Sequence, residues 1–220
     1  MKNILVIFVV MLSSSGFGQV SFTGGASMLI PFKQGVSPYG GFHLGLEIPR
    51  DDQTTLYGRF THHFSQKSQE EYSLYAAPID FTSNLPYALV SVNPSMNYNM
   101  IEGGMRYYIG NGFDFGWAGY GGSNLMLILN KVKGNYGNYD ESLYKLDDVS
   151  RVDGSIFGVG AGLGGGVKYS DARLGTFYFD LNLNYAIFAI PSSNYVSDAL
   201  YSPLIFNFNL GYRRDILWNR

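Results

Sequence analysis

The sequence predicts an all-β protein, an eight-stranded antiparallel β-barrel that crosses a membrane as an up-and-down meander. Three observations lead to this prediction: an export signal, a period-two alternation of apolar and polar residues, and an alternation of short and long connections. The clearest strand is segment 177–188, FYFDLNLNYAIF, which places every second, apolar side chain from Phe177 to Ile187 on one face. Segment 204–212 has the same pattern.

The start of the chain has the three parts of a secretory signal peptide. Lys2 supplies a positive charge, residues 4–12 form an apolar run, and Gly16-Phe17-Gly18 places small residues before Gln19. The run is too short to span a membrane, which takes about 20 apolar residues. We therefore expect a signal peptide over residues 1–18 and one barrel domain over residues 19–220.

The composition excludes several classes of protein. The chain has no cysteine, so disulfides and thiolate metal sites are excluded. Its formal net charge of −2 argues against nucleic acid as a partner, because duplex binding needs clustered Lys and Arg. The 18 Tyr, 16 Phe and 28 Gly favour an exported membrane barrel over a soluble sandwich. We expect neither a cofactor nor a metal.

Eight segments alternate over about the depth of a membrane. They are 20–30, 39–48, 54–64, 97–109, 113–128, 155–169, 176–189 and 204–218. Three connections are short and rich in turn formers, namely 49–53, 110–112 and 170–175. Four are longer, namely 31–38, 65–96, 130–154 and 190–203. This order is typical of an outer-membrane barrel, and it predicts that both mature termini lie in the periplasm.

Two further segments leave the strand number open between eight and ten. Residues 71–77 and 87–93 also alternate, but about seven residues are too few to cross the membrane. They are expected to form a hairpin extension outside it. An even number of strands closes the sheet and leaves no edge in lipid.

The face predicted to point outward suits lipid. In segments 39–48 and 113–128 it carries Phe42, Leu44, Leu46, Ile48, Phe113, Phe115, Trp117, Leu125, Leu127 and Leu129. Aromatic residues gather near both ends of the strands, as in the belts at the two headgroup levels. On the periplasmic side these are Tyr107, Phe115, Trp117, Phe177, Phe179, Tyr212 and Trp218, and on the outer side Phe42, Phe64, Phe157, Phe206 and Phe208. A soluble sandwich with an aromatic core would need no such belts.

The opposite face sends four acids and four bases into the lumen. They are Glu47, Glu102, Asp114 and Asp180 with Arg59, Arg106, Lys168 and Arg213. The interior of an eight-stranded barrel is only wide enough for its own side chains, and buried charges must be paired. Since the signs balance, an ion-pair network that closes the lumen is favoured over the charged lining of a small pore.

Five glycines share the inward face of one segment: Gly158, Gly160, Gly162, Gly164 and Gly166. They are expected to let long side chains such as that of Arg213 cross the lumen. The same stretch matches the dinucleotide-binding pattern G-x-G-x-x-G, but no helix follows, so the match is accidental.

The three histidines offer no convincing active site. His43 and His63 are predicted to face inward on neighbouring strands, and Ser65 lies near His63 in the sequence. No acidic residue is placed beside them, so a catalytic triad is not formed. Two histidines are also too few for a zinc site.

The long connections are the remaining candidates for binding. Connection 65–96 contains Tyr72, Tyr75 and Tyr87, and connection 130–154 contains Asp140 and Glu141 in a mixed-charge stretch. Tyr-rich loops make adaptable contact surfaces. These five residues are therefore the predicted loop contacts.

The whole pattern resembles the small bacterial outer-membrane barrel proteins of the eight-stranded OmpA/OmpX kind. The local resemblance lies in Gly16-Phe17-Gly18-Gln19 and in the final segment from Leu210 to Trp218, which are similar to those of Bacteroidetes-type envelope proteins. That final segment also resembles the C-terminal signal read by the barrel-assembly machinery, although here two residues follow Trp218. The resemblance implies no catalytic residue.

Three functions follow as hypotheses. The first is a non-enzymatic barrel with a closed lumen, acting structurally or binding through its outer loops. The second is a narrow channel for small or apolar solutes, as in the outer-membrane protein W type, and the third is a lipid-modifying enzyme. The expected partners are outer-membrane lipid and lipopolysaccharide, the assembly machinery and an envelope or extracellular protein. The barrel is expected to be a monomer.

Overall fold

The computed structural model describes residues 19–69, 71–80, 82, 85–110, 115–146, 152–192 and 200–218, and every structural statement below concerns these residues. The predicted signal peptide over residues 1–18 lies outside the described residues.

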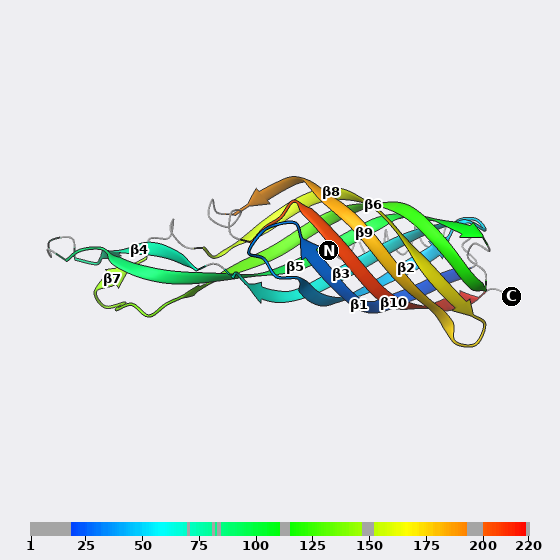
Figure 1. Ribbon diagram of the computed structural model, residues 1–220, viewed down its shortest axis with the longest axis horizontal. Coiled ribbons are helices and arrows are strands. Elements are labelled where there is room, and N and C mark those ends of the chain that lie inside the picture. Colours follow the sequence, from blue (N-terminus) through cyan, green and yellow to red (C-terminus); the bar gives the residue numbers. More distant parts are fainter. Residues whose placement is uncertain are drawn as a thin grey trace, which may run out of the picture.

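Ten strands make up the described structure (Figure 1). Their bounds are β1 Gln19–Pro31, β2 Tyr39–Pro49, β3 Thr54–Lys67, β4 Tyr72–Pro78, β5 Ala88–Gly110, β6 Gly116–Tyr136, β7 Tyr144–Lys145, β8 Gly154–Asp171, β9 Gly175–Pro191 and β10 Leu204–Trp218.

Eight of these strands close into a ring. Each ring strand pairs antiparallel with the next one in the chain, β3 pairs directly with β5, and β10 pairs with β1. β4 and β7 stay outside the ring. The predicted fold class, an antiparallel barrel of eight strands in chain order, is therefore confirmed by the strand pairing itself. A closed ring leaves none of its strands with an unpaired edge.

The short connections have the residues that tight turns need. The Asp51 carboxylate accepts hydrogen bonds from the backbone N–H groups of Gln53 and Thr54, at 2.9 and 2.6 Å. Asp171 does the same for Arg173 and Leu174 after β8, at 2.8 and 2.9 Å. We call this end of the barrel the turn end and the opposite end the outer end.

At the outer end, β5 and β6 continue beyond the ring. β5 has 23 residues and β6 has 21, about twice the length that a spanning strand requires. β4 pairs with β5 from Tyr72 to Ala76, and β7 pairs with the end of β4. Figure 1 shows these parts projecting from one end of the barrel. We call this projecting part, β4 and β7 with the outer parts of β5 and β6, the extension.

The predicted hairpin extension is confirmed, whereas the predicted loop boundaries are wrong. The stretches 65–96 and 130–154 were expected to be loops, but much of each is strand. The strands continue because apolar residues on their inner face pack together: Ala76, Val90 and Leu146 form a small separate core in the extension.

The exterior of the ring is apolar, as the alternation predicts. On β2, on β6 and just before β6 the exposed side chains include Phe42, Leu44, Leu46, Phe115, Trp117, Leu125, Leu127 and Leu129. Phe113 lies outside the described residues, as does the side chain of Trp218. Among the described residues, no helix is long and apolar enough to cross a membrane.

Candidate functional site

The inside of the barrel contains a continuous chain of alternating charges. Three ring strands contribute Arg59, Glu102 and Asp180. Arg59 lies 2.7 Å from Glu102 through Nε and 2.9 Å from Asp180 through Nη1. Arg106 continues the chain, at 2.8 Å from the same Asp180 oxygen and 2.7 Å from Glu47. All five side chains are buried.

The chain ends at Arg213 on β10, whose Nη1 lies 3.4 Å from Glu47. Three acids therefore alternate with three arginines, and the six side chains come from β2, β3, β5, β9 and β10. Equal numbers of the two signs make burial tolerable, since each charge has an opposite partner in a low-dielectric interior.

Neutral side chains complete the hydrogen bonding of the acids. Glu47 accepts from the hydroxyls of Thr55 and Tyr108, each at 2.7 Å. Glu102 accepts from Asn124 Nδ2 at 2.9 Å, and Tyr120 donates to Asp180. A buried carboxylate with several donors is far less costly than one with a single ion pair. These partners were not predicted from the sequence, although their inward positions follow from the same alternation.

Lys168 and Asp114 are the other two predicted members of the network. Lys168 is buried, donates to Ser170 Oγ at 3.1 Å, and places its Nζ 5.5 Å from the ring centre of Tyr108. Asp114 lies outside the described residues.

The outer half of the lumen is filled by apolar residues. This cluster consists of Leu29, Tyr39, Val92, Met96, Tyr98, Met100, Met126, Ile128, Val132, Val152, Ile156, Ala186, Leu200 and Ile205. Tyr39 and Tyr98 cross it edge to face, with ring centroids 5.1 Å apart. Leu200, which precedes β10, is fully buried in this cluster. This cluster was not predicted from the sequence.

An asparagine layer separates the two halves. Asn182 and Asn184 on β9 and Asn207 and Asn209 on β10 are buried and face inward. The inward glycines of β8 make room for some of them, because an added Cβ at Gly162 would collide with Asn184. The prediction that these glycines accommodate Arg213 is wrong: Asn182, Asn184, Met126 and Tyr120 lie against them.

Both inward histidines are fully buried, but neither completes a catalytic triad among the described residues. His43 Nε2 lies 2.7 Å from the hydroxyl of Tyr178. His63 Nε2 lies 3.0 Å from Ser27 Oγ, which donates to Asn209, so the serine beside His63 is Ser27. No described residue hydrogen-bonds to the Nδ1 atom of His63, the position at which a triad carboxylate orients the ring. The described residues also contain no group of three or more potential metal ligands.

The extension presents an exposed apolar patch. Tyr75, Tyr87 and Leu89 are 69%, 65% and 62% exposed, and Tyr75 and Leu89 lie directly opposite each other on β4 and β5. Tyr72, predicted as a loop contact, instead packs partly buried against the apolar cluster of the lumen. We call Tyr75, Tyr87 and Leu89 the extension patch.

The two predicted acidic contacts lie in the turn before β7. Glu141 is exposed. Asp140 accepts hydrogen bonds from Ser142 Oγ and the Ser142 backbone N–H, at 2.6 and 2.9 Å. These donors hold the pKa of Asp140 below its ordinary value, the hydroxyl contributing most. The Asp140 side chain is thus used to shape the turn.

Among the comparisons with known proteins, only the comparison with solved structures finds matches. No family model matches the chain, and no curated protein sequence matches it either. The solved structures include Neisserial surface protein A, with a TM-score of 0.47, 12% identity, and coverage of 89% of this chain and 94% of that one. They also include Ail, the attachment invasion locus protein of Yersinia pestis, with a TM-score of 0.45, 12% identity, and coverage of 89% and 97%.

A third solved structure is the N-terminal β-barrel domain of Pseudomonas aeruginosa OprF, with a TM-score of 0.42, 13% identity, and coverage of 91% and 100%. The structure of Ail contains the heparin analogue sucrose octasulfate. At these identities the likeness concerns the fold alone.

Proposed function

We propose that the chain is a non-enzymatic integral outer-membrane barrel, which anchors the extension at the cell surface as a binding element. One observation carries the membrane location: the outside of the ring is apolar, while six charged side chains are buried inside it, the reverse of a soluble protein. Such an exterior is stable in lipid and costly in water. With the extension on the outside, the short turns and both ends of the mature chain lie in the periplasm.

The packed interior supports a closed lumen. The chain of charges fills the half near the turn end, and the apolar cluster fills the outer half. An eight-stranded barrel offers no more space than its own side chains occupy. We therefore expect refolded protein in planar bilayers to show no steady ohmic conductance. Stable conductance steps would favour the channel instead.

The extension patch supports the binding role. Large exposed apolar side chains are unusual on a surface in water, and they mark contact sites when they cluster. The variant Tyr75→Ser/Tyr87→Ser/Leu89→Ser removes the patch. Ser73→Ala/Ser91→Ala is the matched control, because Ser73 and Ser91 oppose each other on the same two strands.

Retention of cells that display each protein should be measured on apolar and on protein-coated surfaces. We expect the triple variant to lose most of the retention and the control to keep it. Both variants should remain heat-modifiable on gels, since the ring is untouched. Full retention by the triple variant would place the binding role elsewhere.

A further inference from the structure

Two lysines stand side by side on the outer wall of the barrel. Lys131 and Lys133 are two residues apart on β6, share its outward face and are exposed. Among the described residues neither forms an ion pair. The nearby carboxylate of Asp153 accepts hydrogen bonds from Gly134 N–H and the Tyr136 hydroxyl, each at 3.0 Å. Asp153 keeps its negative charge, since both donors are neutral, but two lysines against this one carboxylate still leave a local excess of positive charge.

The lysines mark the level at which the exterior changes from apolar to polar. On β6 the outward side chain before Lys131 is Leu129, which is exposed. On the two neighbouring strands the same change occurs from Ile101 to Asn99 and from Phe157 to Ser155. Ser155 lies directly opposite Lys131. This boundary is where lipid headgroups meet a membrane barrel.

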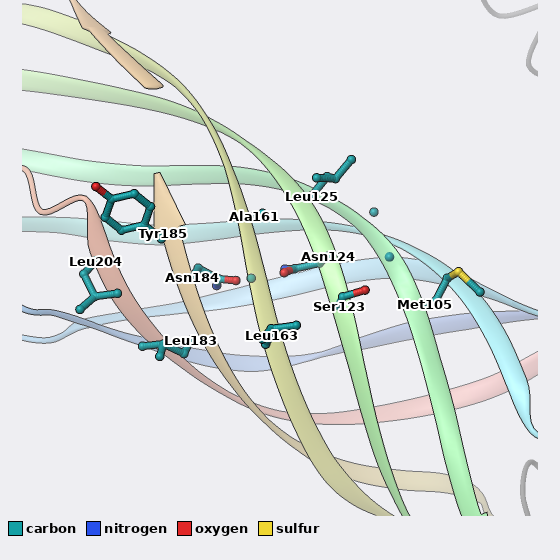
Figure 2. Close-up of a pocket in the computed structure, with 13 residues that line it drawn as sticks. Met105, Ser123, Asn124, Leu125, Ala161, Leu163, Leu183, Asn184, Tyr185 and Leu204 are labelled. Carbon is teal, nitrogen blue, oxygen red and sulfur yellow. The ribbon is translucent and has the colours of Figure 1, made fainter. Parts of the chain in front are cut away.

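An apolar groove lies deeper on the same wall, with a volume of about 590 Å³. Four residues that lie opposite one another on neighbouring strands cross this wall in a row, and small and large side chains alternate along it: Gly103, Leu125, Ala161 and Tyr185. Figure 2 shows the larger groups on β5, β6, β8 and β9 lying around Ala161. We call this hollow the wall groove.

The depth of the wall groove matches the acyl chains of one leaflet. Ser123 in the groove lies eight residues before Lys131, which is about 26 Å along a strand at ~3.3 Å per residue. At a tilt of about 45° this is ~19 Å along the membrane normal, compared with about 15 Å of hydrocarbon in each leaflet. A lipid with its phosphate at Lys131 would therefore bring the ends of its acyl chains to the groove.

We propose that the wall formed by β5, β6 and β8 is a binding site for one phosphate-bearing lipid of the outer leaflet. Its phosphate contacts Lys131 and Lys133, and an acyl chain lies in the wall groove. Charge favours this occupant over a second copy of the chain, since a two-fold contact on this wall would bring the two lysine pairs together at the same height. The inference rests on the proposed membrane location.

Native mass spectrometry of the refolded full barrel tests the site, with phosphatidylglycerol and phosphatidylcholine as probes. We expect the first phosphatidylglycerol to bind more tightly than phosphatidylcholine. Lys131→Ala/Lys133→Ala should weaken the binding of phosphatidylglycerol about fivefold for each lysine removed. The affinity for phosphatidylcholine should stay nearly unchanged. Lys145→Ala/Arg173→Ala removes the same charge from the extension and a turn and should change neither affinity.

Filling the groove tests the second contact. Gly103→Leu/Ser123→Leu should weaken the binding of both lipids. The backbone has room for the change at Gly103, because an added Cβ would lie 3.8 Å from the Tyr57 carbonyl oxygen, an ordinary van der Waals contact. Gly40→Leu, at an exposed glycine with open space at the outer end of β2, is the control. Where the double variant does not refold, Ser123→Leu alone serves.

Three results would overturn the proposal: equal affinity of wild type for the two lipids, a lysine variant that keeps the preference, or a groove variant that leaves both affinities unchanged. If cross-linking in phosphatidylcholine bilayers captured a dimer, and Ser123→Leu abolished that dimer, the wall would be a contact with a second copy of the chain instead. Heat-modifiable migration of each protein separates these results from a failure of the membrane proposal, in which the barrel itself would not form in lipid.

Discussion

The two halves of the lumen are filled by opposite kinds of side chain. Near the turn end, six alternating charges cross the barrel, and each one is neutralised by a neighbour within 3.4 Å. Near the outer end, Met, Tyr, Leu and Ile side chains pack as in a soluble core. The first half depends on complementary charge and the second on shape and apolar area, so the same substitution has different consequences in each.

The contrast continues on the outside of β5, where polarity reverses along a single strand. Within the ring, Glu102 and Arg106 point inward and Ile101 points outward. Further toward the outer end, where β5 still pairs with β3, Tyr98 points inward and Asn99 points outward. The strand keeps its period of two, while in the proposed membrane location its surroundings change from lipid to water. The residue at which the apolar face switches sides therefore indicates where the membrane ends.

The largest effect is expected from breaking the chain of charges. Arg106→Ala removes the partner shared by Glu47 and Asp180 and should lower the free energy of unfolding by about 4 kcal/mol, because buried charges lose their neutralisation. Urea unfolding of the refolded protein in vesicles measures this loss. Arg173→Ala, in an exposed turn, should change it little. Equal stability of the two variants would contradict the assignment of the turn half as charge-dependent.

A smaller effect is expected in the outer half. Ile128→Ala leaves a cavity in the apolar cluster and should cost about 3 kcal/mol. The adjacent Leu127 points toward lipid and is 40% exposed, so Leu127→Ala should cost about half as much, since lipid refills the space. The same urea experiment compares them. A larger loss at Leu127 would mean that the inward and outward faces are assigned in the wrong order.

The smallest effect is expected at the turn end, outside both halves. The backbone N–H of Gln53, followed by the groups of Thr54, holds the pKa of Asp51 below 3.8. A lowered pKa means that the ionised carboxylate stabilises the turn above pH 3.8, and that this contribution disappears as the pH falls through the lowered value. Asp51→Ala should therefore be slightly less stable than wild type at pH 7, and the difference should shrink as the pH falls below 3.8. A difference independent of pH would exclude the carboxylate as its cause.

The sequence by itself favoured eight ring strands over ten, and it determined their order and, where apolar and polar residues alternate clearly, the side of the wall on which a residue lies. The alternation in 177–188 is enough to assign each of its side chains to one face, because successive side chains of a strand point to opposite faces. The turn formers at 49–53 and 170–175 then separate neighbouring strands. The inward position of Glu47, Arg59 and Asp180 follows from this local rule.

Only the tertiary structure decided which inward residues meet. The pairing of Arg106 with both Glu47 and Asp180 depends on barrel closure and on the stagger of β2, β5 and β9, which no local pattern encodes. The apolar cluster was missed for the same reason, since Met96, Tyr98 and Met100 alternate with asparagines and read equally well in either orientation. The contact of His63 with Ser27, rather than with the adjacent Ser65, likewise joins residues 36 positions apart. Alternation specifies a face, whereas the partner across the lumen is specified by closure of the whole ring.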